Sequence, residues 1–264
     1  MQTPHYEVYA LRYGTLAARH AHENFLHAPD DHDGPMPLDY FIWLIRGGGR
    51  TIVVDTGFGE AGAAARKRQY LCRPVEALGR LGITPETVDD VVLSHMHYDH
   101  AGNMGAFGRA RFHVQDAEMA FCTGRCMCHE FIRHTMQVDD VLQAVRFLYA
   151  GQMRFHDGEG EVAPGITVHR VGGHTPGLQV VRVPTRRGWV VLASDATHFW
   201  ANIRQRSPFP VVTDVAGMLE GYLKVESLAD TPDHIIPGHD PLVLKRFPIV
   251  PGATDVVQLH LDPV

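Results

Sequence analysis

The sequence predicts one domain of mixed α+β architecture, in which β-strands and helices follow one another along the chain. Two observations carry this prediction. Short apolar runs rich in valine and isoleucine are bounded by glycine-containing turns, as is typical of buried strands. Between them lie stretches in which apolar residues recur with the period of a helix. The 264 residues contain no long linker, repeat or low-complexity tract, so residues 1–264 are expected to form a single domain.

The composition is that of an ordinary globular protein, with 45% hydrophobic and 20% charged residues. A net charge of -6 gives no electrostatic reason to expect nucleic acid or an anionic membrane as a partner. No apolar run approaches the roughly 20 residues that span a bilayer, and the first residues lack the pattern of a secretory signal. We therefore expect a cytoplasmic protein, monomeric or homodimeric, that acts on a small molecule.

The first half of the chain is expected to begin with a strand that ends in a turn at Gly14. Residues 19–35 have no period and many turn formers, which predicts a long loop, and loops of this length are usually functional or disordered. Two apolar runs about a glycine-rich turn then predict a hairpin. In chain order the predicted elements are a strand at 8–11, the loop, a hairpin formed by 41–46 and 51–55, helices at 61–70 and 74–81, and a strand at 88–93.

The second half continues the alternation of strands and helices. Glycines at 158 and 160 indicate a turn, and Arg186-Arg187-Gly188 indicates the turn of a second hairpin. The predicted elements are a strand at 110–114, helices at 116–121 and 136–147, a strand at 166–171, a hairpin formed by 178–183 and 189–193, a helix at 215–228 and a short strand at 234–236.

A polar cluster directly follows the predicted strand at 88–93. Its His-x-His-x-Asp-His pattern places four possible metal ligands within six residues: His95, His97, Asp99 and His100. Buried unpaired imidazoles and carboxylates cost several kcal/mol, whereas zinc-like cations bind both groups and remove that cost. A histidine-rich surface loop is the alternative, and the close spacing favours a metal site.

Three further polar residues occur where an apolar run meets a turn: His174, Asp195 and His239. A rigid sheet that holds such residues at its strand ends preorganises a site. His95, His97 and His174 would form one metal site, and Asp99, His100 and His239 a second. The carboxylate of Asp195 would bridge two cations about 3.5–4 Å apart. Two sites with open coordination positions are typical of catalytic rather than structural metals.

These motifs together resemble those of the metallo-β-lactamase superfamily. The resemblance covers roughly residues 38–245 and rests on the His95–His100 motif, Gly173-His174-Thr175-Pro176-Gly177, Ser194-Asp195-Ala196, Pro237-Gly238-His239-Asp240 and the turn Asp55-Thr56-Gly57. It implies a four-layer αβ/βα sandwich, with two mixed β-sheets face to face and helices on the outer faces. It also implies two divalent metal ions, with zinc preferred and manganese, iron or cobalt as alternatives.

Within the superfamily, the N-acyl-homoserine lactonase group of quorum-quenching enzymes is the most similar, together with relatives that open other lactones. Glyoxalase II proteins carry a further helical domain, for which the 25 residues after His239 are too few. One position departs from the lactonases, because His198 stands where they typically carry a tyrosine that binds the substrate carbonyl. The expected reaction is lactone opening by a metal-bridging hydroxide, with His198 stabilising the oxyanion and Asp99 carrying the proton.

Other functions stay open at this point. The chain could hydrolyse another cyclic ester, an amide or a thioester, act as a mono-iron oxidoreductase similar to persulfide dioxygenases, or bind metal without catalysis. A substrate pocket is expected to be lined by apolar side chains, for which the candidates are Phe25, Leu26, Met36, Phe41, Phe199, Trp200 and Phe209.

The cysteines at 122, 126 and 128 are interpreted as reduced thiols rather than a structural zinc site. Cys126 and Cys128, on one strand, would point to opposite faces.

Overall fold

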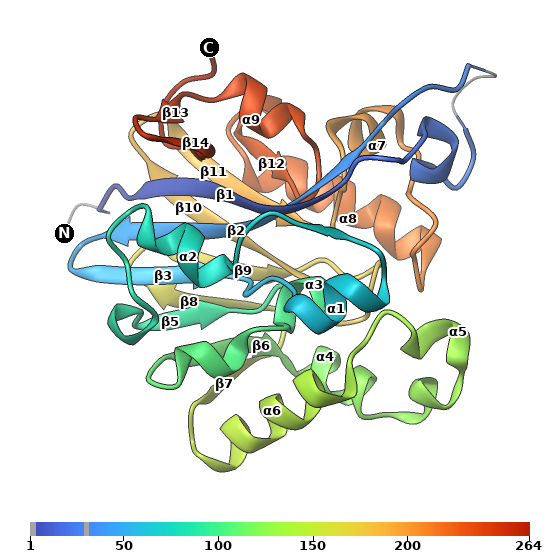
Figure 1. Ribbon diagram of the computed structural model, residues 1–264, viewed down its shortest axis with the longest axis horizontal. Coiled ribbons are helices and arrows are strands. Elements are labelled where there is room, and N and C mark those ends of the chain that lie inside the picture. Colours follow the sequence, from blue (N-terminus) through green and yellow to red (C-terminus); the bar gives the residue numbers. More distant parts are fainter. Residues whose placement is uncertain (1–3, 29–31) are drawn as a thin grey trace.

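Two mixed β-sheets face each other at the centre of the protein (Figure 1). The computed structural model describes residues 4–28 and 32–264, so residues 29–31 of the predicted loop lie outside the described part. Within these residues the larger sheet has nine strands. In spatial order they are β13 (Ile249–Val250), β14 (Ala253–Gln258), β1 (Glu7–Leu16), β2 (Leu38–Gly47), β3 (Arg50–Val54), β5 (Asp90–Val92), β6 (Arg111–Gln115) and β7 (Met153–His156), with β4 (Gln69–Tyr70) paired to β1.

The smaller sheet has five strands within the same described residues. Their order is β12 (Ile235–Pro237), β11 (Gly188–Ser194), β10 (Gln179–Thr185), β9 (Ile166–Arg170) and β8 (Glu159–Ala163). Most neighbours are antiparallel, but β3, β5, β6 and β7 run parallel to one another, as do β11 and β12.

Helices cover the outer faces of both sheets (Figure 1). On the larger sheet they include α1 (Glu60–Ala65), α2 (Pro74–Gly79), α4 (Asp116–Cys122) and α6 (Val138–Tyr149). On the smaller sheet they are α7 (Trp200–Gln205) and α8 (Val215–Leu228). The remaining α-helices of the described residues are α3 (Tyr98–Ala101), α5 (Glu130–Arg133) and α9 (Leu242–Arg246).

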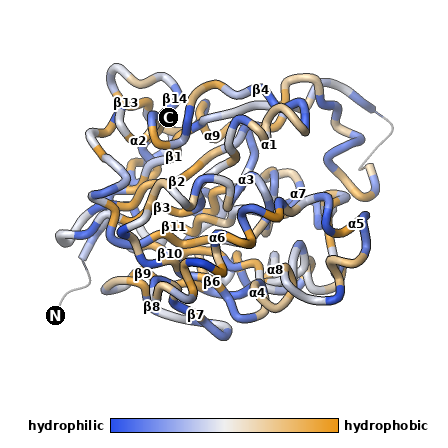
Figure 2. Tube along the Cα trace, turned by 60° about the horizontal axis from the view of Figure 1, so that its bottom comes forward, coloured by the Kyte–Doolittle hydropathy of each residue, from blue (hydrophilic) through white to orange (hydrophobic). Residues whose placement is uncertain are grey.

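Alternation along the strands divides the buried residues into three layers. In β2, Ile42 and Leu44 pack toward the outer helices, whereas Phe41 and Trp43 pack between the sheets. Figure 2 shows hydrophobic residues concentrated in the strands at the centre of the molecule. Because side chains in a strand point to opposite faces in turn, both faces of such a strand are buried. The predicted four-layer sandwich is confirmed.

Several predicted elements differ from the structure. The opening strand does not end at Gly14 but continues to Leu16 through an irregularity between Arg12 and Gly14. The predicted helix at 61–70 stops after Ala65, because the chain then turns to add β4 to the edge of β1. Strands β7, β8, β13 and β14 and helices α7 and α9 were not predicted, since each is short or lacks a clear apolar period.

The cysteine cluster does not lie on a strand, contrary to the expectation from the sequence. Residues Arg125–Cys128 form a 3₁₀-helix, and all four cysteines of the chain are free. Among the described residues, no group of donors that could hold a metal contains a cysteine. The described helices are all too short or too polar to cross a bilayer.

Asp140, in the first turn of α6, is expected to make stability depend on pH. Its side chain is buried, its Oδ2 atom has no hydrogen-bond partner in the described structure, and burial together with Asp139 raises its pKa to about 6. Folding therefore favours the protonated acid, and stability falls as pH rises from the ordinary pKa of 3.8 through about 6. Asp140→Asn should stabilise the protein by about 1–3 kcal/mol at pH 8, measured by thermal or urea unfolding.

The matched control is Asp139→Asn, which removes the same charge from the exposed neighbour. The increase in the free energy of unfolding at pH 8 should be smaller for Asp139→Asn than for Asp140→Asn. A gain for Asp140→Asn that does not increase between pH 4 and pH 8 would contradict this account.

Candidate metal centre and active-site cavity

The predicted metal ligands come together at the carboxyl ends of strands from both sheets. The His95–His100 motif follows β5 of the larger sheet and continues into the single turn of α3. Asp195 and His239 follow the parallel strands β11 and β12 of the smaller sheet, and His174 lies in the loop that joins β9 to β10. All seven predicted ligands are brought into one cluster and are buried or nearly so: His95, His97, Asp99, His100, His174, Asp195 and His239.

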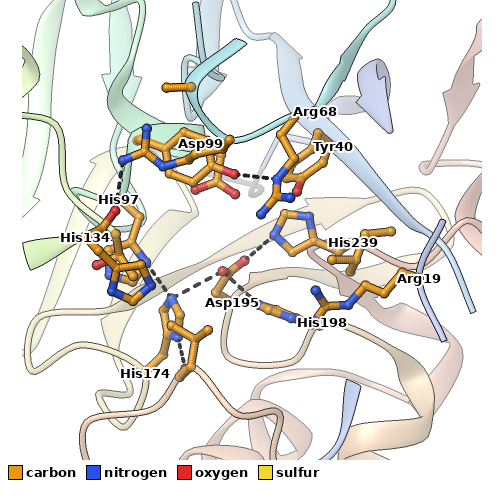
Figure 3. Close-up of a pocket in the computed structure, with 16 residues that line it drawn as sticks. Arg19, Tyr40, Arg68, His97, Asp99, His134, His174, Asp195, His198 and His239 are labelled. Atoms are coloured by element: carbon orange, nitrogen blue, oxygen red, sulfur yellow. Dashed lines mark hydrogen bonds and ion pairs between the residues drawn. The ribbon is translucent and has the colours of Figure 1, made fainter. Parts of the chain in front are cut away.

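Asp195 lies between two groups of imidazoles, and its two carboxylate oxygens face different groups (Figure 3). The Oδ2 atom lies 3.3 Å from His174 Nε2 and 3.8 Å from His95 Nε2. The Oδ1 atom lies 3.0 Å from His239 Nε2 and 3.4 Å from His100 Nε2. A carboxylate with its oxygens divided in this way can bridge two cations.

The first triad consists of His95, His97 and His174. The Nε2 atom of His174 lies 3.1 Å from His95 Nε2 and 2.9 Å from His97 Nδ1. A tetrahedral zinc ion with bonds of about 2.0–2.1 Å separates its ligand atoms by roughly 3.3 Å. The three nitrogens are therefore spaced as ligands of one ion.

The second triad consists of Asp99, His100 and His239. One donor atom from each lies within 4.8 Å of the other two. The Oδ1 atom of Asp99 is 3.8 Å from His100 Nε2. This triad is wider than the first, which leaves space for Asp195 as a further ligand and for a position open to a substrate.

Four of the histidines are oriented by a hydrogen bond on the ring nitrogen that faces away from the cluster. Such a bond fixes the tautomer and leaves Nε2 free to bind a metal. The pairs are His174 Nδ1 with the carbonyl of Val211 (2.6 Å), His239 Nδ1 with the carbonyl of Asp39 (2.9 Å), His100 Nδ1 with the carboxylate of Asp55 (2.7 Å) and His95 Nδ1 with the hydroxyl of Ser94 (3.0 Å).

Asp55, directly after β3, supports the cluster through hydrogen bonds to Ser94 and His100. Its carboxylate is fully buried and accepts hydrogen bonds from the backbone N–H of Ser94 (2.7 Å), the hydroxyl of Ser94 (2.8 Å) and His100 Nδ1. Asp55 has a φ of 61°, a left-handed conformation that aspartate adopts more readily than most residues. This turn directs the carboxylate back toward the end of the neighbouring strand β5.

Glu118 in α4 joins the two loops that carry the first triad. Its buried carboxylate accepts hydrogen bonds from the N–H of Met96 (2.8 Å), the hydroxyl of Thr175 (2.6 Å) and the N–H of Gly177 (3.2 Å). A Cβ atom at position 177 would lie 2.2 Å from the backbone nitrogen of Glu118, so the close approach requires glycine. This role was not predicted, because a single glutamate in a helix carries no distinguishing pattern.

Among the predicted ligands, two buried polar atoms make no hydrogen bond in the described structure, namely His100 Nε2 and Asp195 Oδ1, although His239 Nε2 lies 3.0 Å from the latter. Both face the space between Asp195 and the second triad. An unpaired buried polar atom costs about 1–3 kcal/mol, and a cation between the two would satisfy both. The donor set of imidazoles and carboxylates therefore fits divalent cations such as zinc.

The protonation of the imidazoles agrees with metal binding. Burial lowers the pKa of His95, His97 and His174, and in His95 and His97 it lies well below the ordinary value, so the first triad is neutral near pH 7. In His100 and His239 burial again lowers the pKa, but nearby carboxylates, Asp195 foremost, outweigh burial and raise it. The carboxylates around the second triad thus favour a positive charge there, which a proton or a metal cation can supply.

His198 lies at the edge of the cluster, with Nε2 3.0 Å from Asp195 Oδ2. Its ring stacks on Phe209 with centroids 3.3 Å apart, and burial lowers its pKa to about 3. His198 is close enough to Asp195 and His239 to share an ion. However, its Nδ1 atom is buried without a partner, unlike the four oriented histidines. Ligating histidines almost always donate through the second nitrogen, so His198 lacks the support that orients the four histidines above.

A cavity of about 450 Å³ opens onto this cluster (Figure 3). Its floor includes donors of both triads together with Asp195 and His198. Its remaining lining is Arg19, Leu38, Tyr40, Ala65, Arg66, Arg68, Tyr98, His134, Thr135 and Val211. Among these, Tyr98 lies inside the predicted motif and Arg19 begins the predicted loop, whereas Arg66 and Arg68 carry no pattern that would have placed them here.

The apolar residues predicted to line the pocket do not line this cavity. Met36, Phe199 and Trp200 lie at a separate cavity of about 400 Å³. Trp200 starts α7 and packs between the sheets, where its Nε1 atom donates to the carbonyl of Ile235 (2.8 Å), so its ring turns away from the site. The others are buried elsewhere or exposed: Phe25 and Phe41 are buried, Leu26 is 38% exposed, and Phe209 lies behind His198.

Comparison with known proteins identifies the family. The family described as the metallo-beta-lactamase superfamily matches residues 36–239, which is most of the chain. An N-acyl homoserine lactonase of Bacillus sp is 29% identical over 191 residues, covering 65% of this chain and 70% of the relative. An N-acyl homoserine lactonase AttM of Azorhizobium caulinodans is 26% identical over 264 residues, covering 94% and 98%.

The solved structures agree with these relatives. A quorum-quenching N-acyl homoserine lactone lactonase superposes with a TM-score of 0.72 at 25% identity, covering 91% of this chain and 94% of that chain. The predicted resemblance to the lactonase group is thereby confirmed, since its members recur among relatives and neighbours alike. The chain belongs to the metallo-β-lactamase superfamily, and it is a metal-dependent hydrolase.

Proposed function

We propose that the protein opens the ring of a small lactone with two divalent cations held by the first triad, the second triad and Asp195. The observation that carries this proposal is the division of the Asp195 carboxylate, with Oδ2 facing His174 and Oδ1 facing His239. The names of the lactonase relatives support lactone as the substrate class. Zinc suits the nitrogen and oxygen donors, as do manganese, iron and cobalt.

When bound, the two cations would lower the pKa of a water molecule between them and polarise the substrate carbonyl. The chain's own residues would act around that chemistry. His198 Nε2, once its bond to Asp195 is released, would donate a hydrogen bond to the carbonyl oxygen as negative charge develops there. Asp99 would take the proton of the water and return it to the ring oxygen when the C–O bond breaks, leaving a hydroxy acid.

A second, apolar cavity of about 230 Å³ adjoins the main one and shares His97 and His174 with it. Its other walls include Phe121, Phe131 and Ile132 on one side and Pro210 to Thr213 on the other. Such a cavity would accommodate an alkyl or acyl substituent of the lactone by burying it from water.

The test is to measure metal content and substrate range on the same purified protein. We expect two metal ions per chain, proton release on hydrolysis of at least one lactone, and loss of turnover on chelation with recovery on adding Zn²⁺. One iron per chain with consumption of oxygen would overturn the proposal in favour of an oxidoreductase. Inactivity toward every lactone, with turnover of a thioester or cyclic imide, would overturn the substrate class.

Replacing His198 by alanine tests its role as a donor to the substrate. Removal of one such donor lowers kcat by about 10²–10³-fold in other hydrolases, and we expect a decrease of that order with two metal ions retained. The exposed His129 offers a control, since His129→Ala should change neither value. Loss of a metal ion from His198→Ala would show that His198 is a ligand, contrary to the proposal.

A further inference from the structure

Three arginines line the main cavity, namely Arg19, Arg66 and Arg68, although the chain as a whole has a net charge of -6. The acidic residues of the lining are Asp99 and Asp195, and both belong to the metal-ligand cluster. Among the described residues, no carboxylate lies within ion-pair distance of any of the three arginines. The three arginines therefore have no carboxylate in ion-pair contact among the described residues, although the charges of Glu23 and Asp99 act on Arg19 and Arg68 from a longer distance.

Arg66 has a structural explanation. Its guanidinium lies 3.9 Å above the ring of Tyr98 and donates to the carbonyls of His134 (2.9 Å) and Met136 (3.1 Å). These contacts hold α1 against the segment that precedes α6. Arg66 is thus engaged by the protein, and the remaining positive charge of the cavity lining comes from Arg19 and Arg68.

Arg19 and Arg68 are positioned by the protein but keep free donors. The Nη2 atom of Arg19 donates to the carbonyl of Glu23 (2.7 Å), and its Nε donates to Asn24. The Nε atom of Arg68 donates to the hydroxyl of Tyr98 (3.1 Å). Arg19 Nη1 and both Nη atoms of Arg68 make no hydrogen bond within the described structure. Each side chain is therefore preorganised, with unused N–H groups at the cavity.

The two arginines lie on the same side of the metal-ligand cluster. Figure 3 shows both near His239, whereas His134 lies on the opposite side. Burial lowers the pKa of Arg19, the charges of Glu23 and Tyr40 act against this, and the charge of Arg68 lowers it further, so the two guanidinium groups are near enough to interact. Two half-buried guanidinium groups that face one cavity, with no carboxylate of the described residues in ion-pair contact, form a site for an anion.

We propose that Arg19 and Arg68 bind an anionic group of the substrate, a carboxylate or a phosphate, placed apart from the lactone carbonyl on the His239 side of the cavity. This inference rests on the proposed lactonase function and narrows its substrate to anionic lactones. A neutral lactone would leave both guanidinium groups without a partner.

The experiment compares three lactones that share one ring: one with a carboxylate substituent, one with a phosphate-bearing substituent and one with a neutral methylamide. The protein loaded with metal should hydrolyse one of the anionic lactones with a kcat/KM at least about tenfold above that of the methylamide, since charged hydrogen bonds are strong. The preference should reside mainly in KM and decrease with rising salt. The anionic lactone with the higher kcat/KM shows whether the two arginines bind a carboxylate or a phosphate.

The double variant Arg19→Gln/Arg68→Gln should bring the ratio of anionic to neutral kcat/KM close to one. The matched control Arg73→Gln/Arg109→Gln removes two exposed arginines and should keep the ratio of the wild type. If the double variant does not fold, the wild-type preference and its salt dependence decide the matter alone.

Equal hydrolysis of all three lactones by the wild type would overturn this inference and leave the lactonase function intact. A preference that survives in the double variant would also overturn it. Hydrolysis of none of them, with two metals bound, would instead count against the lactonase function itself.

Discussion

Replacing Asp195 by asparagine should reduce the metal content from two ions per chain to one or none and lower kcat/KM by at least about a thousandfold. The change keeps the shape of the side chain but removes the charge and one of the two oxygens that face opposite triads. Bridged metals contribute several kcal/mol to stabilising the transition state, and about 4 kcal/mol corresponds to that factor. Elemental analysis and steady-state kinetics on the same preparation provide the measurement.

Asp157→Asn is a suitable control for this variant, because Asp157 is exposed and distant in sequence from the cluster. It should retain both ions and full turnover. Two ions in Asp195→Asn together with wild-type kinetics would exclude a bridging role for Asp195.

Replacing Asp55 by asparagine should weaken metal binding by about 10–100-fold, as seen when the partners of metal-binding histidines are changed. It should also lower the free energy of unfolding by about 2–4 kcal/mol. The asparagine NH₂ group would face a donor, either His100 Nδ1 or Ser94, and leave it unpaired. Asparagine tolerates the left-handed conformation at this position as well as aspartate does. The effect therefore reports the lost carboxylate rather than backbone strain.

The measurement for Asp55→Asn is a competition titration with a metal-binding dye, combined with denaturant unfolding in chelator. A purely structural role would lower stability in chelator while the affinity for metal remained that of the wild type. Unchanged affinity would therefore contradict the assignment of Asp55 as a positioning residue.

The metal-ligand cluster could be found from the sequence because its chemistry is local. Four donors within six residues have no packing explanation, and His174, Asp195 and His239 each follow an apolar run. The layers of the fold were implied by the resemblance to the metallo-β-lactamase superfamily, since a strand such as β2 is buried on both faces and shows no alternation of polar and apolar residues. The ligand motifs depend on neighbours in the chain, so the sequence contains them.

The substrate side of the site depends on tertiary contacts and could not be predicted in this way. Phe199 and Trp200 follow the site loop directly, but α7 starts there and turns the indole into the core between the sheets. Arg19 and Arg68 lie on different segments, and only folding brings them to one cavity. Their proposed role follows from N–H groups left without a hydrogen bond among the described residues, which a sequence does not reveal.

The origin of the ligands in two different sheets has a consequence for unfolding. An ion shared by Asp195 and the His95–His100 motif would act as a cross-link, because the sheets could not separate without releasing it. Stability would then rise with the logarithm of the free metal concentration, by about 1.4 kcal/mol for each tenfold increase above the dissociation constant. Metal supply would thus regulate how long the folded protein survives as well as whether it is active.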